Sequence, residues 1–346
     1  MTYPWQVSQW DKLSEVLKSG RLPHALMLSG TAGTGKKQFS AQFANLVLCN
    51  QVFNQVGAQG ALRSCGECKN CKLVLAEAHP DIRHYTFELN PKGVKSTVIT
   101  IDQIRSLNEF VAKSSQQGGY KIALIHPAEA MNINAANALL KSLEEPSQKT
   151  LIVLVVDQPG RMLPTIRSRC QVIEFPMPDN NQSMSWLKQA LPDNTLLEDL
   201  LELAAGSPIK AAELAETDAI SQRQTMITEL AQVLKRETSA VSVASKWQKH
   251  DIHTVLDWNL SWVQQLIRFS MTHDDAMVRD ERLLKMFQYL SGKHSASKFY
   301  DLLGQIQAYS DLLAKKTNPN PQILIENLLI AWAELMQKKK AITVSC

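Results

Sequence analysis

A glycine-rich loop between an apolar run and a helical pattern constrains the fold more than any other segment. Residues 30–37 read GTAGTGKK; the apolar run 24–29 precedes them, and residues 37–48 follow with helical periodicity. Loops of the form Gly-x4-Gly-Lys-Ser/Thr join a strand to a helix and cradle phosphates with backbone amides and the lysine. Gly30, Gly35 and Lys36 match this form. The pattern predicts an α/β domain derived from a nucleotide-binding site.

The groups that would hydrolyse a nucleotide are missing around this loop. Lys37 stands where a Ser or Thr hydroxyl would bind magnesium, and the apolar run 121–125 is followed by His126 and Pro127. Nucleotide hydrolases carry acidic residues after the corresponding strand. Glu129 lies two residues beyond Pro127, so we do not count it as a substitute. The sequence predicts a degenerate phosphate loop that binds nucleotide weakly or not at all and does not hydrolyse Mg-ATP.

Two continuous apolar runs indicate a parallel sheet. Residues 121–125 and 151–156 are rich in β-branched side chains, as in strands that are buried on both faces. Between them, residues 132–145 show helical periodicity that ends at a proline, and residues 173–175 form the expected last strand. Strands and helices that alternate in this way predict an α/β domain.

The strand signal fades after Pro178, where short helices are expected over 183–191, 195–205 and 209–215. Longer amphipathic helices are expected from 221 to 340, with Trp258 and Trp262 in their core. The expected domains are 1–177, 178–216 and 217–346.

Four cysteines are close together in the sequence. Cys49, Cys65, Cys68 and Cys71 offer four thiolates, and each x2 spacing lets two sulfurs meet one ion. An iron–sulfur cluster is the main alternative, but no Cys-Pro follows and the fourth cysteine lies upstream. We therefore expect structural Zn²⁺ with no open coordination position. Thiols clustered for a metal rather than spread for disulfides favour a reducing, cytoplasmic location.

The charge is small and unevenly distributed. The chain of 346 residues has 37 Lys and Arg against 33 Asp and Glu, a net charge of +4. Residues 1–177 carry 19 basic against 13 acidic side chains, whereas residues 178–346 carry 18 against 20. A dedicated DNA-binding protein usually has a stronger basic field, so we expect nucleic-acid contacts only in company with other subunits.

The longest apolar run is too short to cross a membrane, and no secretory signal is visible.

Several motifs together point to one family. Residues 135–146 read AANALLKSLEEP, and Ser168-Arg169-Cys170 follows. The four-cysteine insertion, His79-Pro80-Asp81 and Tyr3-Pro4-Trp5 fit the same group. The chain resembles the delta-prime (δ′) subunits of bacterial DNA polymerase III clamp loaders, within the AAA+ clamp-loader family.

This resemblance implies an α/β N-terminal AAA+ (RecA-like) parallel-sheet domain with a zinc-binding insertion, then a small helical lid and an all-α C-terminal collar. It implies a non-hydrolysing stator that supports ATP-dependent loading of the sliding clamp onto primed DNA. The implied partners are the delta and gamma/tau subunits in a hetero-pentamer, with the clamp and primer–template DNA met through the complex. The lid of motor subunits begins with Gly-Ser-x-Arg, whereas residues 206–209 here read GSPI and lack the arginine. The polymerase activity belongs to the holoenzyme.

The resemblance also assigns a role to Arg169. Its Ser-Arg-Cys motif matches the one that presents an arginine finger, in trans, to the ATP site of an adjacent gamma/tau subunit. A solvated or ion-paired arginine is the plainer alternative, and Arg167 is a nearby second candidate. Ser168 is expected to shape the turn, because no His–acid pair accompanies it.

Two other functions stay open on the residues alone. An active gamma/tau-like ATPase would retain Lys36, but Lys37, His126, Pro127 and Ile209 argue against it. A zinc-dependent DNA-binding module is less favoured, since the charge is near neutral and the thiolate set is closed.

Overall fold

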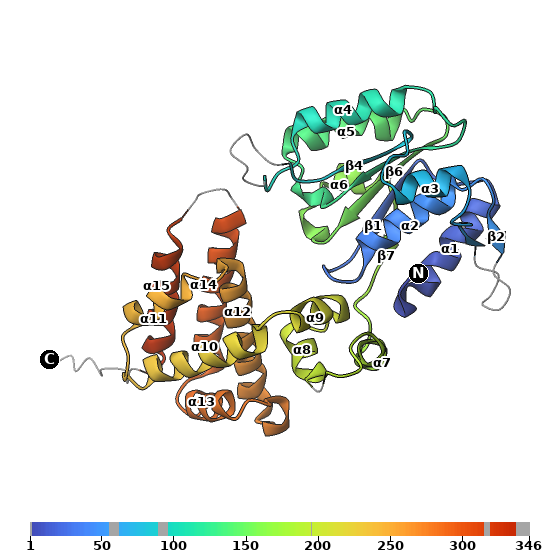
Figure 1. The fold of residues 1–346 in the computed structure, drawn as a ribbon. Coiled ribbons are helices and arrows are strands. Elements are labelled where there is room, and N and C mark those ends of the chain that lie inside the picture. Colours follow the sequence, from blue (N-terminus) through green and yellow to red (C-terminus); the bar gives the residue numbers. More distant parts are fainter. Residues whose placement is uncertain (1, 55–61, 89–95, 195, 315–318, 337–346) are drawn as a thin grey trace. The chain divides into compact units, whose positions relative to one another are not determined.

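The computed structural model describes residues 2–54, 62–88, 96–194, 196–314 and 319–336. Two compact units divide the chain between residues 213 and 214 (Figure 1). Residue 195, at the expected start of a short helix, and residues 315–318 and 337–340, within the expected C-terminal helical region, lie outside the described residues.

A five-stranded sheet forms the centre of the first unit, and all its strand pairs are parallel. The strand order is β4-β5-β6-β1-β7, which leaves β7 at one edge beside the strand that leads into the glycine loop. In the register, Leu26 lies opposite Val153 on one side and Gln171 on the other. The strands are β1 (Ala25–Ser29), β4 (Ile82–Tyr85), β5 (Lys121–Ile125), β6 (Thr150–Val156) and β7 (Gln171–Glu174).

Helices cover both faces of this sheet (Figure 1). Helices α1 (Val7–Lys18) and α2 (Lys36–Leu48) pack on one face, and α4 (Ile101–Ala112) and α5 (Ile133–Glu144) on the other. Successive side chains of a strand point to opposite faces, so Ile152 and Val153 enter different cores. Every residue of β1, β5 and β6 is buried, which confirms the predicted parallel α/β core.

Polar side chains cap the N-termini of α4 and α5, the two helices on the same face of the sheet. The Asn132 side chain accepts a hydrogen bond from the backbone N–H of Ala135 and so starts α5. Thr100 and Gln103 form a reciprocal capping box at α4. A short helix, α6 (Pro164–Arg167), leads into β7.

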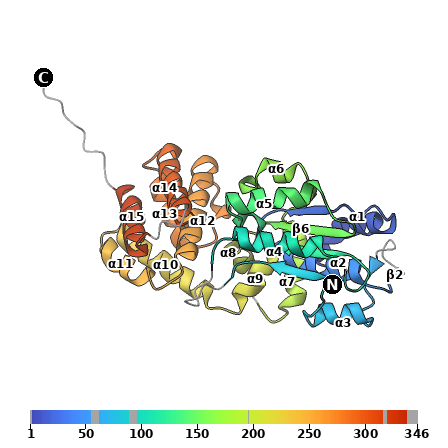
Figure 2. The ribbon, with the colours of Figure 1, turned by 90° about the horizontal axis from the view of Figure 1, so that it is seen from above.

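A small insertion separates α2 from β4. It contains the antiparallel pair β2 (Phe53–Asn54) and β3 (Leu62–Arg63), followed by α3 (Lys69–Leu75). Figure 2 shows α3 and β2 at the outer edge of this unit. The indole N–H of Trp10 donates to the Leu62 carbonyl oxygen at 2.9 Å, which ties the insertion to α1.

Three short helices follow the sheet and agree with the expected ones to within three residues. They are α7 (Asn180–Ala190), α8 (Leu197–Leu203) and α9 (Pro208–Ala215). Trp186 of α7 meets the rings of Tyr3 and Trp5 edge-on, with centroid distances of 5.5 and 5.7 Å. The N-terminal segment η1 (Pro4–Gln6) therefore packs against this helical layer as well as against the sheet domain.

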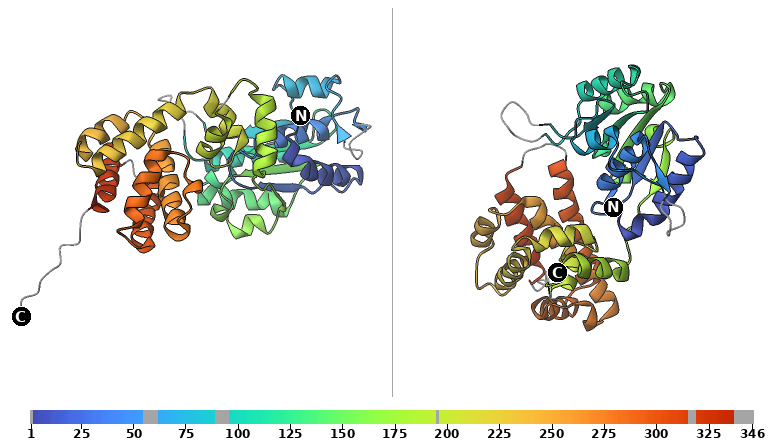
Figure 3. Two further views of the ribbon diagram at one scale, coloured as in Figure 1. Left: turned by 90° about the horizontal axis from the view of Figure 1, so that it is seen from below. Right: turned by 45° about the vertical axis from the view of Figure 1, so that its right-hand side comes forward.

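The second unit is helical in its described part (yellow to red in Figure 3). Trp262 is fully buried and Trp258 is 6 % exposed, which confirms their predicted place in the core. The buried Asn259 accepts the indole N–H of Trp332 at 3.0 Å and donates to the Val255 carbonyl oxygen. None of the helices described in the chain is long and apolar enough to cross a membrane. The helices are α10 (Ala219–Leu234), α11 (Ala240–Trp247), α12 (Ile252–Thr272), η4 (Asp275–Met277), α13 (Glu281–Ser291), α14 (Ala296–Ala314) and α15 (Pro321–Glu334).

Candidate functional site

The glycine loop holds its lysine in internal contacts. Lys36 begins α2, and its side chain is 2 % exposed. Its Nζ donates to the Thr31 carbonyl oxygen at 2.5 Å and to Thr34 Oγ1 at 3.2 Å, and it lies 2.8 Å from Asp157 Oδ1. An ammonium has three N–H donors, so these three oxygens use all of them.

Asp157 directly follows β6, the strand beside β1, and the carboxyl ends of both strands meet at this edge of the sheet. Its second oxygen, Oδ2, lies 3.3 Å from His126 Nε2. Burial raises the pKa of Asp157, but hydrogen bonds and charge from His126 and Lys36 outweigh this and hold it below its usual value. Glu129 Oε1 accepts the backbone N–H groups of Asp157 and Gln158, each at 3.0 Å. Glu129 thus supports the backbone that carries Asp157.

The chain's own N-terminal segment and the helical layer cover the loop. The Trp5 indole N–H and the Gln6 side-chain amide both donate to the Thr34 carbonyl oxygen, at 3.0 and 2.8 Å. The Ser207 hydroxyl donates to the Gly33 carbonyl oxygen at 2.9 Å. Polar groups of the loop backbone are therefore satisfied by side chains from two other parts of the unit.

Two of the predicted loop glycines are required by geometry. Gly35 has φ +84°, and a Cβ there would come within 2.6 Å of the Tyr3 ring. A Cβ on Gly30 would lie 2.1 Å from the Phe175 carbonyl oxygen, just after β7. Lys37, at the position of the magnesium ligand, is exposed.

The four predicted cysteine ligands come together. The Sγ atoms of Cys49, Cys65, Cys68 and Cys71 all lie within 4.8 Å of one another. Cys49 directly follows α2, and Cys68 caps the start of α3, so two helix ends help to place the set. The backbone N–H groups of Cys65 and Cys68 point at the sulfurs of Cys49 and Cys65, at 3.3 and 3.2 Å. Backbone N–H groups aimed at sulfur favour thiolates, which are the form that binds a metal ion.

The pKa values of the thiols differ within the set, because burial raises those of Cys49 and Cys71 while that of Cys68 is lowered. Burial raises the pKa of Cys68, but hydrogen bonds from the Cys71 and Asn50 amides and from neighbouring thiols bring it down to about 6. Cys170, which is not part of the set, has its pKa raised to about 12 by burial. Cys170 is therefore an inert thiol packed against the sheet core.

Arg169 lies between α6 and β7 and is exposed. Its guanidinium contacts Glu144 Oε1 at 2.7 Å and donates to the Thr165 carbonyl oxygen at 3.0 Å. The side chains of Arg169 and Glu144 are 37 % and 49 % exposed, so this ion pair is largely solvated. Such pairs contribute about 0–1 kcal/mol, and the arginine can leave its partner at little cost.

His79-Pro80-Asp81 holds a loop rather than forming a site. The buried Asp81 carboxylate accepts the Ser115 hydroxyl and the backbone N–H groups of Gln116 and Gln117 at 2.8–3.1 Å. These contacts fix the connection that leads into β5.

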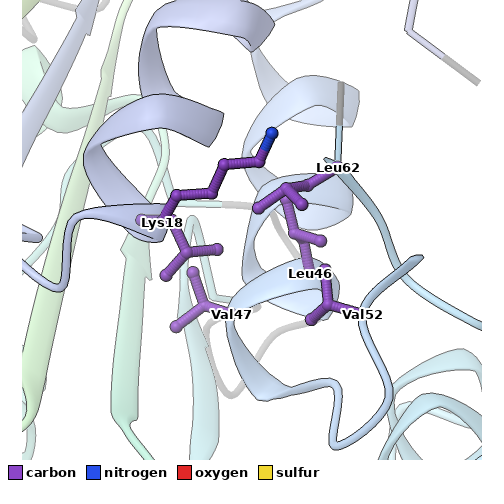
Figure 4. A pocket seen from close by; sticks show the side chains of 6 residues that line it. Lys18, Leu46, Val47, Val52 and Leu62 are labelled. Carbon is purple, nitrogen blue, oxygen red and sulfur yellow. The ribbon is translucent and has the colours of Figure 1, made fainter. Parts of the chain in front are cut away.

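An apolar hollow of about 370 Å³ lies between α1, α2 and the insertion (Figure 4). It offers aliphatic surface and one lysine, without an acid–base pair or a metal ligand, so it is not a catalytic site. Its lining residues are Leu17, Lys18, Leu46, Val47, Val52 and Leu62.

Comparison with known proteins decides the family. Residues 5–179 match the family model "DNA polymerase III, delta subunit", and residues 217–334 match "DNA polymerase III, delta subunit, C terminal". DNA polymerase III subunit delta′ of Pseudomonas aeruginosa is 38% identical over 96% of this chain and 98% of its own length. The chain belongs to the DNA polymerase III delta′ family.

A second relative agrees with this assignment. The delta′ subunit of Escherichia coli K12 is 30% identical over 97% of this chain and 96% of its own. Among solved structures, a DNA polymerase III gamma subunit-related protein from Thermotoga maritima covers 96% of this chain and all of its own, at 18% identity and a TM-score of 0.44. As a member of the delta′ family, the chain is a component of the DNA polymerase III clamp-loader complex and acts in DNA replication.

One contact residue of the glycine loop in this delta′ family member does not follow from the sequence analysis. Asp157 follows β6 and contacts Lys36, which follows β1 and the glycine loop, and no sequence motif includes Asp157. The sequence does contain one indication of Asp157 as a site residue: it is a carboxylate directly after a fully buried strand. The neighbouring β1 ends in the glycine loop, but only the strand order shows that the two strands are adjacent.

Proposed function

We propose that this chain is the non-hydrolysing delta-prime stator of the clamp loader. In a hetero-pentamer with delta and gamma/tau subunits, it supports ATP-dependent loading of the sliding clamp onto primer–template DNA. It supplies Arg169 in trans to an adjacent gamma/tau ATP site, and it works in the cytoplasm, where the free thiols of its cysteine cluster fit a reducing environment.

The main observation that supports a non-hydrolysing role is that the Lys36 ammonium is engaged by the chain itself. Its ammonium is buried, and three oxygens of the chain itself use its donors. Phosphoryl transfer needs a lysine and a metal ion placed around the phosphates. The exposed Lys37 offers an ammonium where magnesium needs an oxygen ligand, and His126 sits beside Asp157 in place of an acidic pair.

The position of Arg169 supports the finger. It lies just before β7, which is an edge strand, and it is held by solvated contacts to Glu144, Thr165 and Ser168. An arginine at such a place can leave its ion-pair partner, Glu144, and contact the developing negative charge of a transferred phosphoryl group instead. That electrostatic role needs no other catalytic group from this chain.

The cysteine cluster supports a structural zinc ion. Cys49, Cys65, Cys68 and Cys71 would supply four thiolates, and tetrahedral zinc accepts such a set with no position left for substrate. The ion would join the end of α2 to the start of α3 and so stabilise the insertion.

The deciding experiment replaces Arg169 in the reconstituted complex. Arg169→Ala should leave assembly and ATP binding unchanged. It should slow hydrolysis at the adjoining gamma/tau site by on the order of 10³-fold or more, because a finger contributes on the order of 10³–10⁵ in rate. Other sites would continue to turn over, so single-turnover hydrolysis and clamp loading are both measured.

Arg167→Ala is the matched control, since Arg167 is exposed at the end of α6 and lies two residues away. It should have a smaller effect on both rates. Clamp loading and ATP hydrolysis at the wild-type rate with Arg169→Ala would show that Arg169 is structural.

A further inference from the structure

We propose that Asp157 is a built-in anion that takes the place of a nucleotide phosphate at Lys36. Replacing its carboxylate by a neutral group should then expose a latent binding site for a phosphate or polyphosphate group. This inference rests on the proposed function in one respect, that the chain does not use this loop to hydrolyse ATP.

The three acceptors at Lys36 differ in kind. Thr31 and Thr34 belong to the loop itself, and their oxygens are neutral. Asp157 alone brings a negative charge, and it comes from the end of a different strand. A phosphate in an intact phosphate loop brings negative charge to the same lysine and to the N-terminus of the same helix.

Asp157 is itself held in place. His126 contacts its second oxygen, and Glu129 accepts its backbone N–H and that of Gln158. The side chain is 24 % exposed and Lys36 is 2 % exposed, so water weakens this pair far less than a surface ion pair. The contact therefore joins two fixed elements, α2 and the end of β6.

An incoming phosphate would meet two obstacles here. It would have to displace the carboxylate from an ammonium whose donors are all in use. It would also lie close to a carboxylate of like charge, and such juxtaposition in a partly buried site is unfavourable. Asp157→Asn removes the like charge and leaves a neutral amide oxygen, which a phosphate displaces from Lys36 more easily than a carboxylate, and it keeps the size of the side chain.

The test measures inorganic pyrophosphate binding to the full-length chain by isothermal titration calorimetry without magnesium. Asp157→Asn should bind pyrophosphate on the order of tenfold more tightly than the wild-type chain, or more, once competition and repulsion are removed. Adding Lys36→Met to this variant should abolish the gain. Asp102→Asn, at a carboxylate on α4 that is 81 % exposed, should bind like the wild type.

Asp157→Ser guards against a folding defect of the amide variant and carries the same expectation. A folded Asp157 variant without gained affinity would overturn the proposal, and so would wild-type binding as tight as that of the variant. Failure of both variants to fold even with pyrophosphate present would also contradict it, because the ligand should replace the missing charge. Phosphate release from Mg-ATP by the wild-type chain would instead overturn the proposed function.

Discussion

At the scale of single residues, the ion pairs of this chain differ by how far apart their partners lie in the sequence. Lys36 and Asp157 belong to elements distant in sequence, and their contact depends on the completed sheet. Asp280 instead acts locally at the start of α13, where its carboxylate accepts the backbone N–H groups of Arg282 and Leu283. The Arg282 guanidinium also contacts it at 2.9 Å. A local cap of this kind can be tested without disturbing the sheet domain.

The Asp280 cap should make the free energy of unfolding depend on pH in the acidic range. Burial raises the pKa of Asp280, but hydrogen bonds from Arg282 and two amides lower it below its ordinary 3.8. A lowered folded-state pKa adds stability that is present above about 3.8 and is lost as the pH falls through the folded-state value. Asp280→Ala should therefore cost about 1 kcal/mol at pH 7, and the difference from wild type should shrink toward pH 3.

Urea unfolding at several pH values, followed by circular dichroism, measures this difference. Asp301→Ala is the control, because Asp301 is 65 % exposed and contacts Lys298 only at 3.7 Å. It should change stability by less than about 0.5 kcal/mol. A loss for Asp280→Ala that is equally large at pH 7 and pH 3 would refute the charge argument.

At the scale of elements, the helices and strands that could be predicted are those marked by a local sequence pattern. The apolar runs at β5 and β6 predicted buried strands, and Asn132 and the following proline bracketed α5. The strand β4 has no such run, because it lies at an edge and buries only Tyr85 fully. Edge strands of this kind carry too little apolar alternation to be recognised.

The same distinction holds for the site. The spacing of the cysteines and the glycine loop are local, so the cluster and Lys36 could be predicted as candidates. Asp157 and the cover formed by Trp5 and Ser207 depend on contacts between segments far apart in sequence. No periodicity or spacing encodes such contacts, and they required the folded chain.

Metal removal should loosen the insertion more than the sheet. Structural zinc sites contribute folding energy, and here the four thiols tie α3 to the end of α2. A strong chelator should speed amide hydrogen exchange over α3, while β5 and β6 stay protected because they are fully buried. Mass spectrometry of exchange, with elemental analysis of the metal released, reports both effects.

Cys170→Ser is the control for this measurement, because this thiol lies outside the cluster. It should leave the metal content at one zinc per chain, whereas Cys71→Ser should lower it. Iron in the elemental analysis, or a folded chain that contains no metal, would contradict the zinc assignment.

At the scale of the whole molecule, two compact units have different roles in the proposal. The first unit contains the glycine loop, the cysteine cluster and Arg169, and the second has a helical core built around buried tryptophans. The two DNA polymerase III delta-subunit family models each match a segment within one unit. The residues named in the proposed function therefore all lie before residue 214.

The purified full-length chain should not turn over Mg-ATP. Lys36 is occupied, the magnesium hydroxyl is replaced by Lys37, and no acidic pair follows β5. Steady-state phosphate release should equal that of Lys36→Ala, and hydrolysis should appear only when the gamma/tau subunits are added. Phosphate release by the isolated chain that Lys36→Ala abolishes would identify an active ATPase instead.

Helix α2 sets a length constraint that couples its two ends. It begins at Lys36 and ends at Leu48, directly before Cys49, so one rod of about 20 Å joins the glycine loop to the cysteine cluster. A single inserted residue would turn Cys49 by about 100° around the helix axis relative to Lys36. The orientations of the two ends around the helix axis are therefore coupled, and a chimera that exchanges the loop for that of an active ATPase must preserve the number of residues in this helix.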